Sequence, residues 1–296
     1  MTSGVERRTQ GRSGSVARTK RSESATEVAA LLRRYHIRPT HHRGQNFLIS
    51  DEVYKDILNA AELSVADTVL EVGAGLGTLT ERLAARAGRV VAVEVDPRLT
   101  RLLRQRFMTQ SNITIIEADI LRCQLATLNV APPYKVVANI PYYLTSQLLK
   151  KFLTETTPPS SLTLLVQREV AQRIVAIPGD MSLLALSVQL YSKPKIIRMV
   201  PASFFIPPPA VASALITITD VHCFPFSDVL EKRFWQVARI GFAAKRKQLI
   251  NNLAGGFRLS RPDVSHALAS AGIPSSARAQ DLSLADWRLL TRILSR

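Results

Sequence analysis

The chain has 296 residues, 46% of them apolar, and its 39 Lys and Arg against 23 Asp and Glu give a net charge of +16. This length allows one large domain or two, and the positive charge predicts a polyanionic partner, either nucleic acid or an anionic membrane surface. The longest strongly apolar run, Leu183 to Leu190, is too short to span a bilayer. Two cysteines without CxxC spacing argue against a disulfide scaffold and a structural zinc site. No apolar leader precedes the first basic cluster, so we expect no export.

Residues 1–28 are rich in Arg, Ser, Thr and Gly and lack a periodic apolar face, which predicts a disordered basic arm. A transit peptide shares the Arg and Ser bias, but the weak amphipathic pattern favours a solvated arm. His41 and His42 are adjacent rather than four residues apart. This spacing favours a basic entry segment over a pair of metal ligands, so we expect no metal.

Between residues 29 and 221, segments typical of buried strands alternate with helical segments. This alternation predicts an α/β domain with a mainly parallel, Rossmann-like sheet covered on both faces. Two later strands are predicted around a proline-rich turn. The expected strands are 67–75, 89–96, 113–119, 134–142, 161–167, 195–209 and 213–220, and helices are expected at 79–87, 99–107 and 146–153.

From residue 222 onward the strand patterns stop and helical patterns follow. This segment carries 12 Lys and Arg against 5 Asp and Glu. Because a positive surface attracts the phosphates of nucleic acids, residues 222–296 are predicted to form a small all-helical domain that binds RNA.

A glycine-rich turn, Gly73–Gly77, follows Glu71 where the first predicted sheet strand becomes a helix. Glycine lets the backbone approach a ligand closely, although such a turn often serves geometry alone. The second strand ends in Glu94, 21 residues after Gly73, where an acid can accept hydrogen bonds from both hydroxyls of a ribose. Asp119 ends the third strand, where it could meet an adenine amine or simply form a turn. Together these positions predict an adenosine-bearing cofactor without pyrophosphate, and S-adenosylmethionine fits better than NAD.

The fourth strand ends in Asn139-Ile140-Pro141-Tyr142. An exocyclic amine of a base is weakly nucleophilic because its lone pair is delocalised into the ring. The amide oxygen of Asn139 and the carbonyl of Ile140 can accept its two N–H bonds, and Pro141 frees that carbonyl from the strand ladder. Tyr142 can stack on a base turned out of its helix. The motif therefore predicts methyl transfer to a base amine, with a plain Asn-Pro turn as the alternative.

The chain resembles the ribosomal RNA adenine-N6 dimethyltransferase family from about Tyr35 to the C-terminus. Seven segments follow the family's order: GQNFL, EVGAGLGTLT, VEVD, EADIL, NIPYYLTS, QREVAQRI and FFIPPPAVASA. The resemblance implies a S-adenosylmethionine-dependent methyltransferase in which Phe205 sandwiches the adenine opposite Tyr142. It also implies cofactor contacts at Gln45, Asn46, Leu48, Gly73, Gly75, Glu94, Asp119 and Asn139.

The segments GFAAKRKQLINNL and RAQDLSLADW resemble C-terminal signatures of the family's bacterial small-subunit branch. This resemblance implies dimethylation of two adjacent adenosines in the 3′-terminal hairpin of 16S rRNA in the small ribosomal subunit. It implies a helix with Arg246, Lys247 and Asn251 that grips phosphates, for which a solvated face is the alternative. The chain departs from the family pattern at Met181–Leu186 and at Ala212, both expected near the RNA approach.

Two other functions stay open. The antibiotic-resistance branch methylates a large-subunit adenosine, but the two C-terminal segments point away from it. An RNA-binding factor for ribosome assembly, with catalysis secondary, belongs to a different class, against which the intact Asn139 and Tyr142 argue. Metal-dependent hydrolysis has no support. We expect a cytoplasmic monomer that acts on the small ribosomal subunit and does not bind membranes.

Overall fold

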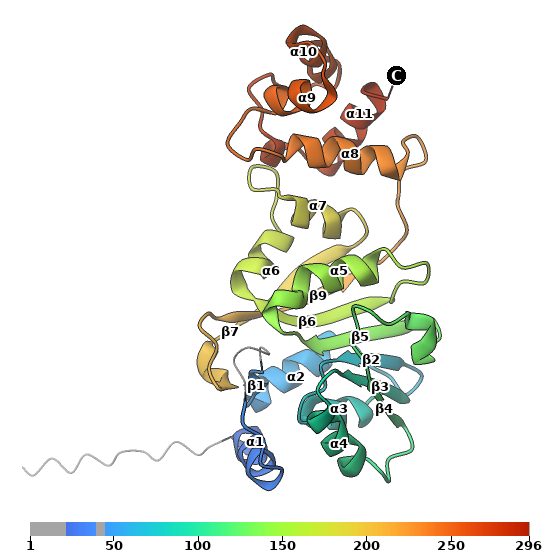
Figure 1. Cartoon of the computed structure of the whole chain (residues 1–296), viewed down its shortest axis with the longest axis vertical. Helices are drawn as coiled ribbons and strands as arrows, with labels where there is room; N and C mark the ends of the chain where they lie inside the picture. The colour runs from blue at the N-terminus through green and yellow to red at the C-terminus, as the bar shows by residue number, and fades with distance from the viewer. Residues whose placement is uncertain (1–21, 40–44, 296) are drawn as a thin grey trace, which may run out of the picture.

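The computed structural model describes residues 22–39 and 45–295. Residues 1–21, predicted as an arm, and the pair His41 and His42 lie outside the described residues. Figure 1 shows two stacked parts, an α/β part built around the sheet and a group of helices at the C-terminal end of the molecule. No helix in the described part of the chain is both long and apolar enough to cross a membrane.

The α/β part contains one seven-stranded sheet with the order β4-β3-β2-β5-β6-β9-β7. Strands β2 to β6 are parallel, whereas β9 is antiparallel to its neighbours β6 and β7. This topology confirms the predicted fold class. The strands are β2 (Thr68–Val72), β3 (Arg89–Glu94), β4 (Ile113–Glu117), β5 (Tyr134–Asn139), β6 (Ser161–Gln167), β7 (Lys193–Val200) and β9 (Ser213–Thr219).

Helices cover both faces of the sheet. Successive side chains of a strand point to opposite faces, so neighbouring residues pack against helices on different sides. Leu70 lies in one hydrophobic cluster with Leu149 of α5 and Leu186 of α7. Its neighbour Val69 lies in another with Ile57 of α2. The covering helices are α2 (Asp51–Ala60), α3 (Thr78–Ala84), α4 (Pro97–Arg106), α5 (Thr145–Leu153), α6 (Arg168–Ile174) and α7 (Leu183–Gln189).

Short elements complete the α/β part. Strand β1 (Phe47–Leu48) pairs antiparallel with β8 (Phe205–Ile206), so segments far apart in the sequence form a small ladder beside the main sheet. The short 3-10 helices are η2 (Leu125–Leu128), η3 (Tyr142–Leu144) and η4 (Ala202–Phe204).

Helix α1 (Glu23–Arg34) begins inside the predicted arm, so the assignment of residues 23–28 to a disordered segment is wrong. The Ser22 hydroxyl caps the helix by accepting the Ala25 N–H at 3.1 Å. Val28 is fully buried in a cluster that includes Leu103 of α4. The sequence did not predict the start of this helix because the composition of the segment is polar. A few buried apolar side chains and a good cap are nevertheless enough to order it.

The C-terminal helices are α8 (Glu231–Gly241), α9 (Leu249–Phe257), α10 (Arg261–Ser270), the 3-10 helix η5 (Ala279–Asp281) and α11 (Leu284–Ile293). The predicted division at residue 222 lies in the segment that joins β9 to α8. Fully buried Trp287 and Phe234 belong to the same hydrophobic cluster as Leu186 and the sheet residue Ile216. The helical part therefore shares its core with the α/β part.

One of the two departures from the family pattern has a local explanation in the fold. Met181 and Leu186 are buried in the large hydrophobic cluster, so their side chains serve packing rather than RNA contact. Ala212 lies just before β9, and its backbone carbonyl accepts the Arg168 N–H at 3.0 Å, a bond that does not depend on the side chain, so the structure does not explain the alanine.

Candidate active site

A cavity of about 420 Å³ opens at the carboxyl ends of the parallel strands β2, β3 and β5. Open α/β sheets bind ligands at this edge. The structure brings all eight predicted cofactor contacts together here, although their binding of a cofactor stays a prediction. They are Gln45, Asn46, Leu48, Gly73, Gly75, Glu94, Asp119 and Asn139.

The glycine-rich turn forms one wall of the cavity in a backbone conformation that suits glycine. Gly73, Gly75 and Gly77 have φ values of +74°, +59° and +81°. A Cβ on Gly77 would lie 2.6 Å from a ring carbon of Phe107. The turn thus needs glycine both for its backbone angles and for close packing beneath it.

Glu94, at the end of β3, holds this turn in place. One carboxylate oxygen accepts the Gly75 N–H at 2.9 Å, and the other accepts the N–H groups of Val95 and Asp96 at 2.9 and 3.0 Å. A carboxylate has about four acceptor positions, so these three bonds leave about one. This count does not test the prediction that Glu94 accepts both ribose hydroxyls, which stays a prediction.

Asp119 lies in the turn after β4 and lines the cavity. Its carboxylate accepts the Leu121 N–H at 3.0 Å and lies 3.5 Å from the Arg122 guanidinium. The side chain thus has the turn-forming role that the sequence left open. Its position on the cavity wall keeps the predicted contact with an adenine amine available.

Asn139 ends β5 and faces the segment that precedes β1. Its amide nitrogen donates to the Asn46 carbonyl at 3.1 Å, so its oxygen is the group that remains to accept a hydrogen bond. The strand ladder ends with the pairing of Asn139 and Leu165, which places the Ile140 carbonyl beyond it. Pro141 lines the cavity, whereas the side chain of Ile140 is buried.

The two aromatic residues predicted to hold the base do not line the cavity. Tyr142 is half-buried, and its hydroxyl lies 2.8 Å from the Ser213 hydroxyl. Phe205 is only 2% exposed because β8 pairs with β1 and directs this ring into the core with Leu48. Phe205 therefore offers no face to a base in this structure, which corrects the predicted sandwich. Tyr143, which the sequence reasoning passed over, lines the cavity and is 64% exposed.

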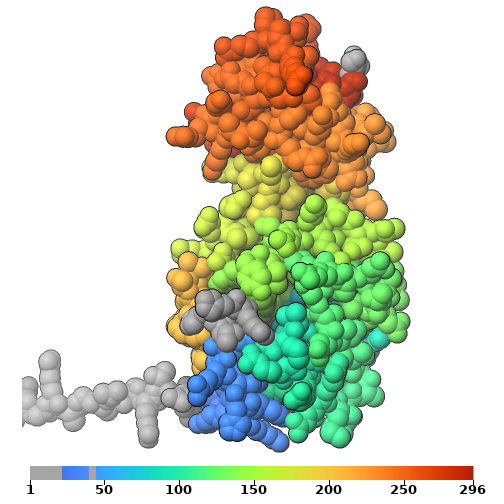
Figure 2. Space-filling model, in the orientation of Figure 1, coloured from blue at the N-terminus to red at the C-terminus, as the bar shows by residue number. Residues whose placement is uncertain are grey.

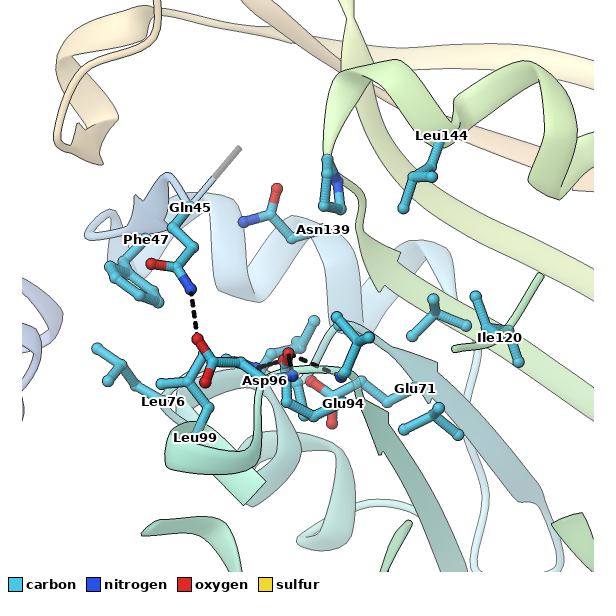
Figure 3. A pocket seen from close by; sticks show the side chains of 18 of the residues that line it. Gln45, Phe47, Glu71, Leu76, Glu94, Asp96, Leu99, Ile120, Asn139 and Leu144 are labelled. Atoms are coloured by element: carbon cyan, nitrogen blue, oxygen red, sulfur yellow. Dashed lines mark hydrogen bonds between the residues drawn. The ribbon is translucent and has the colours of Figure 1, made fainter. Parts of the chain in front are cut away.

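Glu71 and Asp96 also line the cavity and were not among the predicted site residues. Figure 3 shows Glu71 beside Glu94, and Gln45 pointing toward Asp96, to which its amide nitrogen donates at 3.4 Å. Glu71 is 1% exposed, and one of its oxygens has no hydrogen-bond partner among the described residues. Burial, aided by the nearby Glu94 charge, raises the pKa of Glu71 to about 8. The sequence feature that could have identified Glu71 and Asp96 as site residues is their position near the ends of predicted parallel strands.

The cavity lining has acidic side chains and, among the described residues, no Lys, Arg or His: the acids are Glu94, Asp96, Asp119 and Glu71, whose pKa of about 8 keeps it largely protonated at neutral pH. Asp96 and Asp119 pair with arginines outside the lining, whereas Glu71 and Glu94 form no ion pair with a described residue. The cavity therefore suits a ligand that carries positive charge. No group of three or more His, Cys, Asp or Glu in residues 22–39 and 45–295 is arranged to hold a metal ion.

The sequence model of the family described as ribosomal RNA adenine dimethylase matches residues 39–295. The chain belongs to the ribosomal RNA adenine dimethylase family. This confirms the resemblance found in the motifs and makes the chain a methyltransferase of that family.

Several proteins with similar sequences agree with this assignment, and solved structures show a similar fold. The ribosomal RNA small subunit methyltransferase A of Dehalococcoides mccartyi strain BAV1 is 43% identical over 89% of this chain and 91% of its own. That of Alkaliphilus oremlandii is 34% identical over 93% and 99%. Among solved structures, the 23S rRNA methyltransferase ErmE has a TM-score of 0.66 at 28% identity, over 85% of this chain and 100% of its own. A dimethyladenosine transferase from Plasmodium falciparum shares the fold, with a TM-score of 0.68 at 23% identity, over 82% and 95%.

In this member of the dimethylase family, the predicted RNA contacts lie in the C-terminal part of the chain, and none of them lines the cavity. Arg246 and Lys247 are exposed, but they belong to the turn between α8 and α9 rather than to a helix, which corrects the prediction. Asn251 lies on α9 and accepts a hydrogen bond from Arg261. Asn252 fixes the turn, because its amide nitrogen donates to the carbonyls of Gly241 and Ala244 at 2.6 and 3.2 Å.

Proposed function

We propose that this protein transfers methyl groups from S-adenosylmethionine to N6 of two adjacent adenosines in the 3′-terminal hairpin of 16S rRNA. Two transfers to each adenosine make four per RNA, with one cofactor consumed at each step. The observation that carries the proposal is the acidic cavity that joins the glycine-rich turn, Glu94 and Asp119 to Asn139 at one edge of the sheet. We propose further that the protein acts in the cytoplasm, as a monomer, on the small ribosomal subunit.

The lining residues fit S-adenosylmethionine in charge and in shape. The cofactor is a cation with a sulfonium centre and an ammonium group, and the cavity presents acids without a described basic residue. Glu71 supplies a buried carboxyl oxygen that lacks a partner among the described residues. At Gly75 a side chain would meet the Phe47 ring at 3.3 Å, so glycine keeps the space beside the turn open. Glu94 would accept hydrogen bonds from both ribose hydroxyls, and Asp119 would accept one from the adenine amine.

The reaction needs the target amine held in a pyramidal form, and the residues at the end of β5 can do this. The side-chain oxygen of Asn139 would accept a hydrogen bond from one N–H of the target amine. The hydrogen bond from the Asn139 amide nitrogen to the Asn46 carbonyl fixes the orientation of this oxygen. The Ile140 carbonyl would accept a hydrogen bond from the second N–H of the amine. When bound, the cofactor supplies an activated methyl group, so the protein needs no general base of unusual pKa.

Tyr142 would support the ring of the target adenine. The bond of its hydroxyl to Ser213 restrains the ring at the start of η3, directly after Pro141. Tyr143 lines the cavity beside it and adds apolar surface at the entrance. Arg246 and Lys247 would bind phosphates of the RNA backbone at a position remote from the cavity. Exposed cations attract phosphates whatever the base sequence.

The small-subunit substrate is favoured over a large-subunit one by the identities of the relatives. Two relatives named for the small subunit reach 43% and 34% identity over nearly their whole length. The structure named for 23S rRNA reaches 28%. The C-terminal segments with Arg246 and Lys247 support the same branch.

The deciding experiment measures transfer of labelled methyl groups to small ribosomal subunits that lack these methylations, with large-subunit RNA in parallel. Dimethylated adenine in the small-subunit hairpin is the expected result, and the Asn139→Ala variant serves as the inactive control. Label in large-subunit RNA alone would assign the protein to the resistance branch. Binding of small subunits without any transfer would favour an assembly factor.

A further inference from the structure

Helix α1 lies outside the region that the family model matches, which starts at residue 39, yet it contacts the wall of the cofactor cavity. Val28 shares a hydrophobic cluster with Phe47, Ala74 and Leu76, and these three residues line the cavity. Figure 2 shows the blue N-terminal segment lying against the teal surface of the residues that follow it in the α/β part. The helix is therefore placed to influence the glycine-rich turn.

Glu27 connects α1 to two arginines on different helices. One carboxylate oxygen lies 3.0 Å from Arg82 of α3, and the other lies 2.6 Å from Arg106 of α4. Glu27 is one-quarter exposed and Arg106 is 15% exposed, so the pairs are partly shielded from solvent. Such shielded, two-sided contacts fix side-chain geometry better than exposed surface pairs do.

Each of the two arginines donates to a backbone carbonyl at the end of the glycine-rich turn. Arg106 reaches the Leu76 carbonyl at 2.8 Å, and Arg82 reaches the Thr78 carbonyl at 2.6 Å. These carbonyls flank Gly77, whose backbone has a left-handed conformation. The carboxylate of Glu27 thus orients both donors that hold this end of the turn.

Arg82 extends the network to strand β1. Its guanidinium lies 4.3 Å from the centre of the Tyr54 ring. The Tyr54 hydroxyl lies 2.7 Å from the Thr78 hydroxyl and donates to the Leu48 carbonyl at 3.0 Å. Because Leu48 and Tyr54 both line the cavity, the network joins two of its walls.

We infer that Glu27 is a positioning residue for cofactor binding, which acts by orienting Arg82 and Arg106 against the glycine-rich turn. The inference rests on the proposed function, since it presumes that the cavity binds S-adenosylmethionine. Loss of the Glu27 carboxylate leaves Arg106 with Glu81 and Arg82 with the Ser24 hydroxyl as remaining side-chain partners, so the two guanidinium groups hold the turn less firmly. The cofactor then binds more weakly, while the residues that hold the target amine stay unchanged.

The test compares Glu27→Ala and the isosteric Glu27→Gln with Glu23→Ala. Glu23 is a matched control, because it is an exposed acid of the same helix and its side chain makes no contact with either arginine. Titration calorimetry with S-adenosylmethionine gives the Kd, and steady-state methyl transfer gives kcat and the KM for each substrate. Glu27→Ala is expected to raise the cofactor Kd and KM about tenfold, and Glu27→Gln about threefold. The kcat at saturating cofactor and the KM for RNA stay within twofold of the parent values.

Other outcomes distinguish the possible failures. If both Glu27 variants bind the cofactor with the same Kd as Glu23→Ala, the inference is wrong, and α1 contributes only packing against the α/β part. A loss confined to kcat, with the cofactor KM unchanged, would indicate a general loss of folded protein and would also overturn it. If Glu27→Ala does not fold, Glu27→Gln carries the test, because it keeps the shape of the side chain. If the parent protein does not bind S-adenosylmethionine, the proposed function fails and the inference fails with it.

Discussion

Asn139 has two roles in the proposed site, one for each atom of its amide. The nitrogen holds the segment before β1 through the Asn46 carbonyl at 3.1 Å, and the oxygen would accept a hydrogen from the target amine. Replacement by alanine removes the acceptor that stabilises the reacting amine, which typically costs 10²- to 10³-fold in rate. We expect Asn139→Ala to lose at least about a hundredfold in kcat while the cofactor Kd rises less than tenfold. Single-turnover transfer and calorimetry measure the two, with Asn112→Ala as a remote amide control.

Glu71 links the stability of the protein to pH. The native carboxyl has a pKa of about 8 against an ordinary value of 4.5, so the native state binds more protons than the unfolded chain between these values. The free energy of unfolding therefore falls as pH rises through this range, by at most about 1.4 kcal/mol per pH unit. Below the range both states are protonated, and the effect disappears.

The Glu71→Gln variant should remove this slope, because glutamine keeps the size of the side chain and does not titrate. We expect the variant to gain stability relative to the parent as pH rises from 5 to 8. Urea unfolding at four pH values in this range measures the difference. Parallel curves for the two proteins would show that Glu71 does not hold its proton in the native state.

At the level of single residues, the sequence predicted the cavity lining well and the aromatic contacts poorly. Gly73, Glu94 and Asp119 follow predicted parallel strands, and strand ends meet at one edge of a sheet. The burial of Phe205 depends on the ladder between β1 and β8, which joins segments more than 150 residues apart. No local pattern reveals such a long-range pairing.

Among the structural elements, the turn between α8 and α9 has its own testable role. Lys245, Arg246 and Lys247 are consecutive and exposed, and buried Asn252 holds the turn that carries them. Removing two cations that contact phosphates weakens RNA binding and lowers its salt dependence. For Arg246→Ala/Lys247→Ala we expect the slope of log K against log salt to fall by about 1.5, with the base preference unchanged. Equal effects from Lys193→Ala/Lys195→Ala, a matched charge loss on β7, would argue against a specific contact.

The strands of the sheet were predictable because their apolar runs are continuous and bounded by polar residues, as in residues 89–94 of β3. Helix α1 was not, since its cap at Ser22 bonds to groups that the sequence does not place nearby. The Ser22 hydroxyl donates to the Ile49 carbonyl, and Asp51 accepts the N–H groups of Glu23 and Ser24 at 3.0 Å. These contacts order a polar segment that composition alone assigns to an arm.

At the scale of the whole molecule, the two parts share contacts across their junction. Trp235 of α8 donates to the Tyr191 hydroxyl at 2.9 Å, and the two rings are stacked with centres 6.4 Å apart. Both tryptophans of the chain, Trp235 and Trp287, belong to the C-terminal helices. Their fluorescence therefore reports on the part that does not contain the cavity.

The shared core predicts that both parts unfold together. A ligand of the cavity should then stabilise the distant helices as well. At one hundred times its Kd, S-adenosylmethionine should raise the midpoint of thermal unfolding by about 5 °C, by tryptophan fluorescence and by circular dichroism alike. A shift seen by circular dichroism alone, in a transition with two steps, would show that the parts unfold independently.

The bond between Glu94 and the Gly75 N–H has a consequence for selectivity in the cell. Glycine-rich turns of this kind often offer their N–H groups to phosphates. Here the protein's own Glu94 carboxylate takes the Gly75 N–H, so a phosphate would meet this carboxylate in place of the donor. ATP and related nucleotides contain the same adenosine, yet their phosphates would meet repulsion instead of donors. If the cavity binds S-adenosylmethionine as proposed, it can therefore distinguish this sulfonium compound from nucleotides by charge, without recognising the adenosine differently.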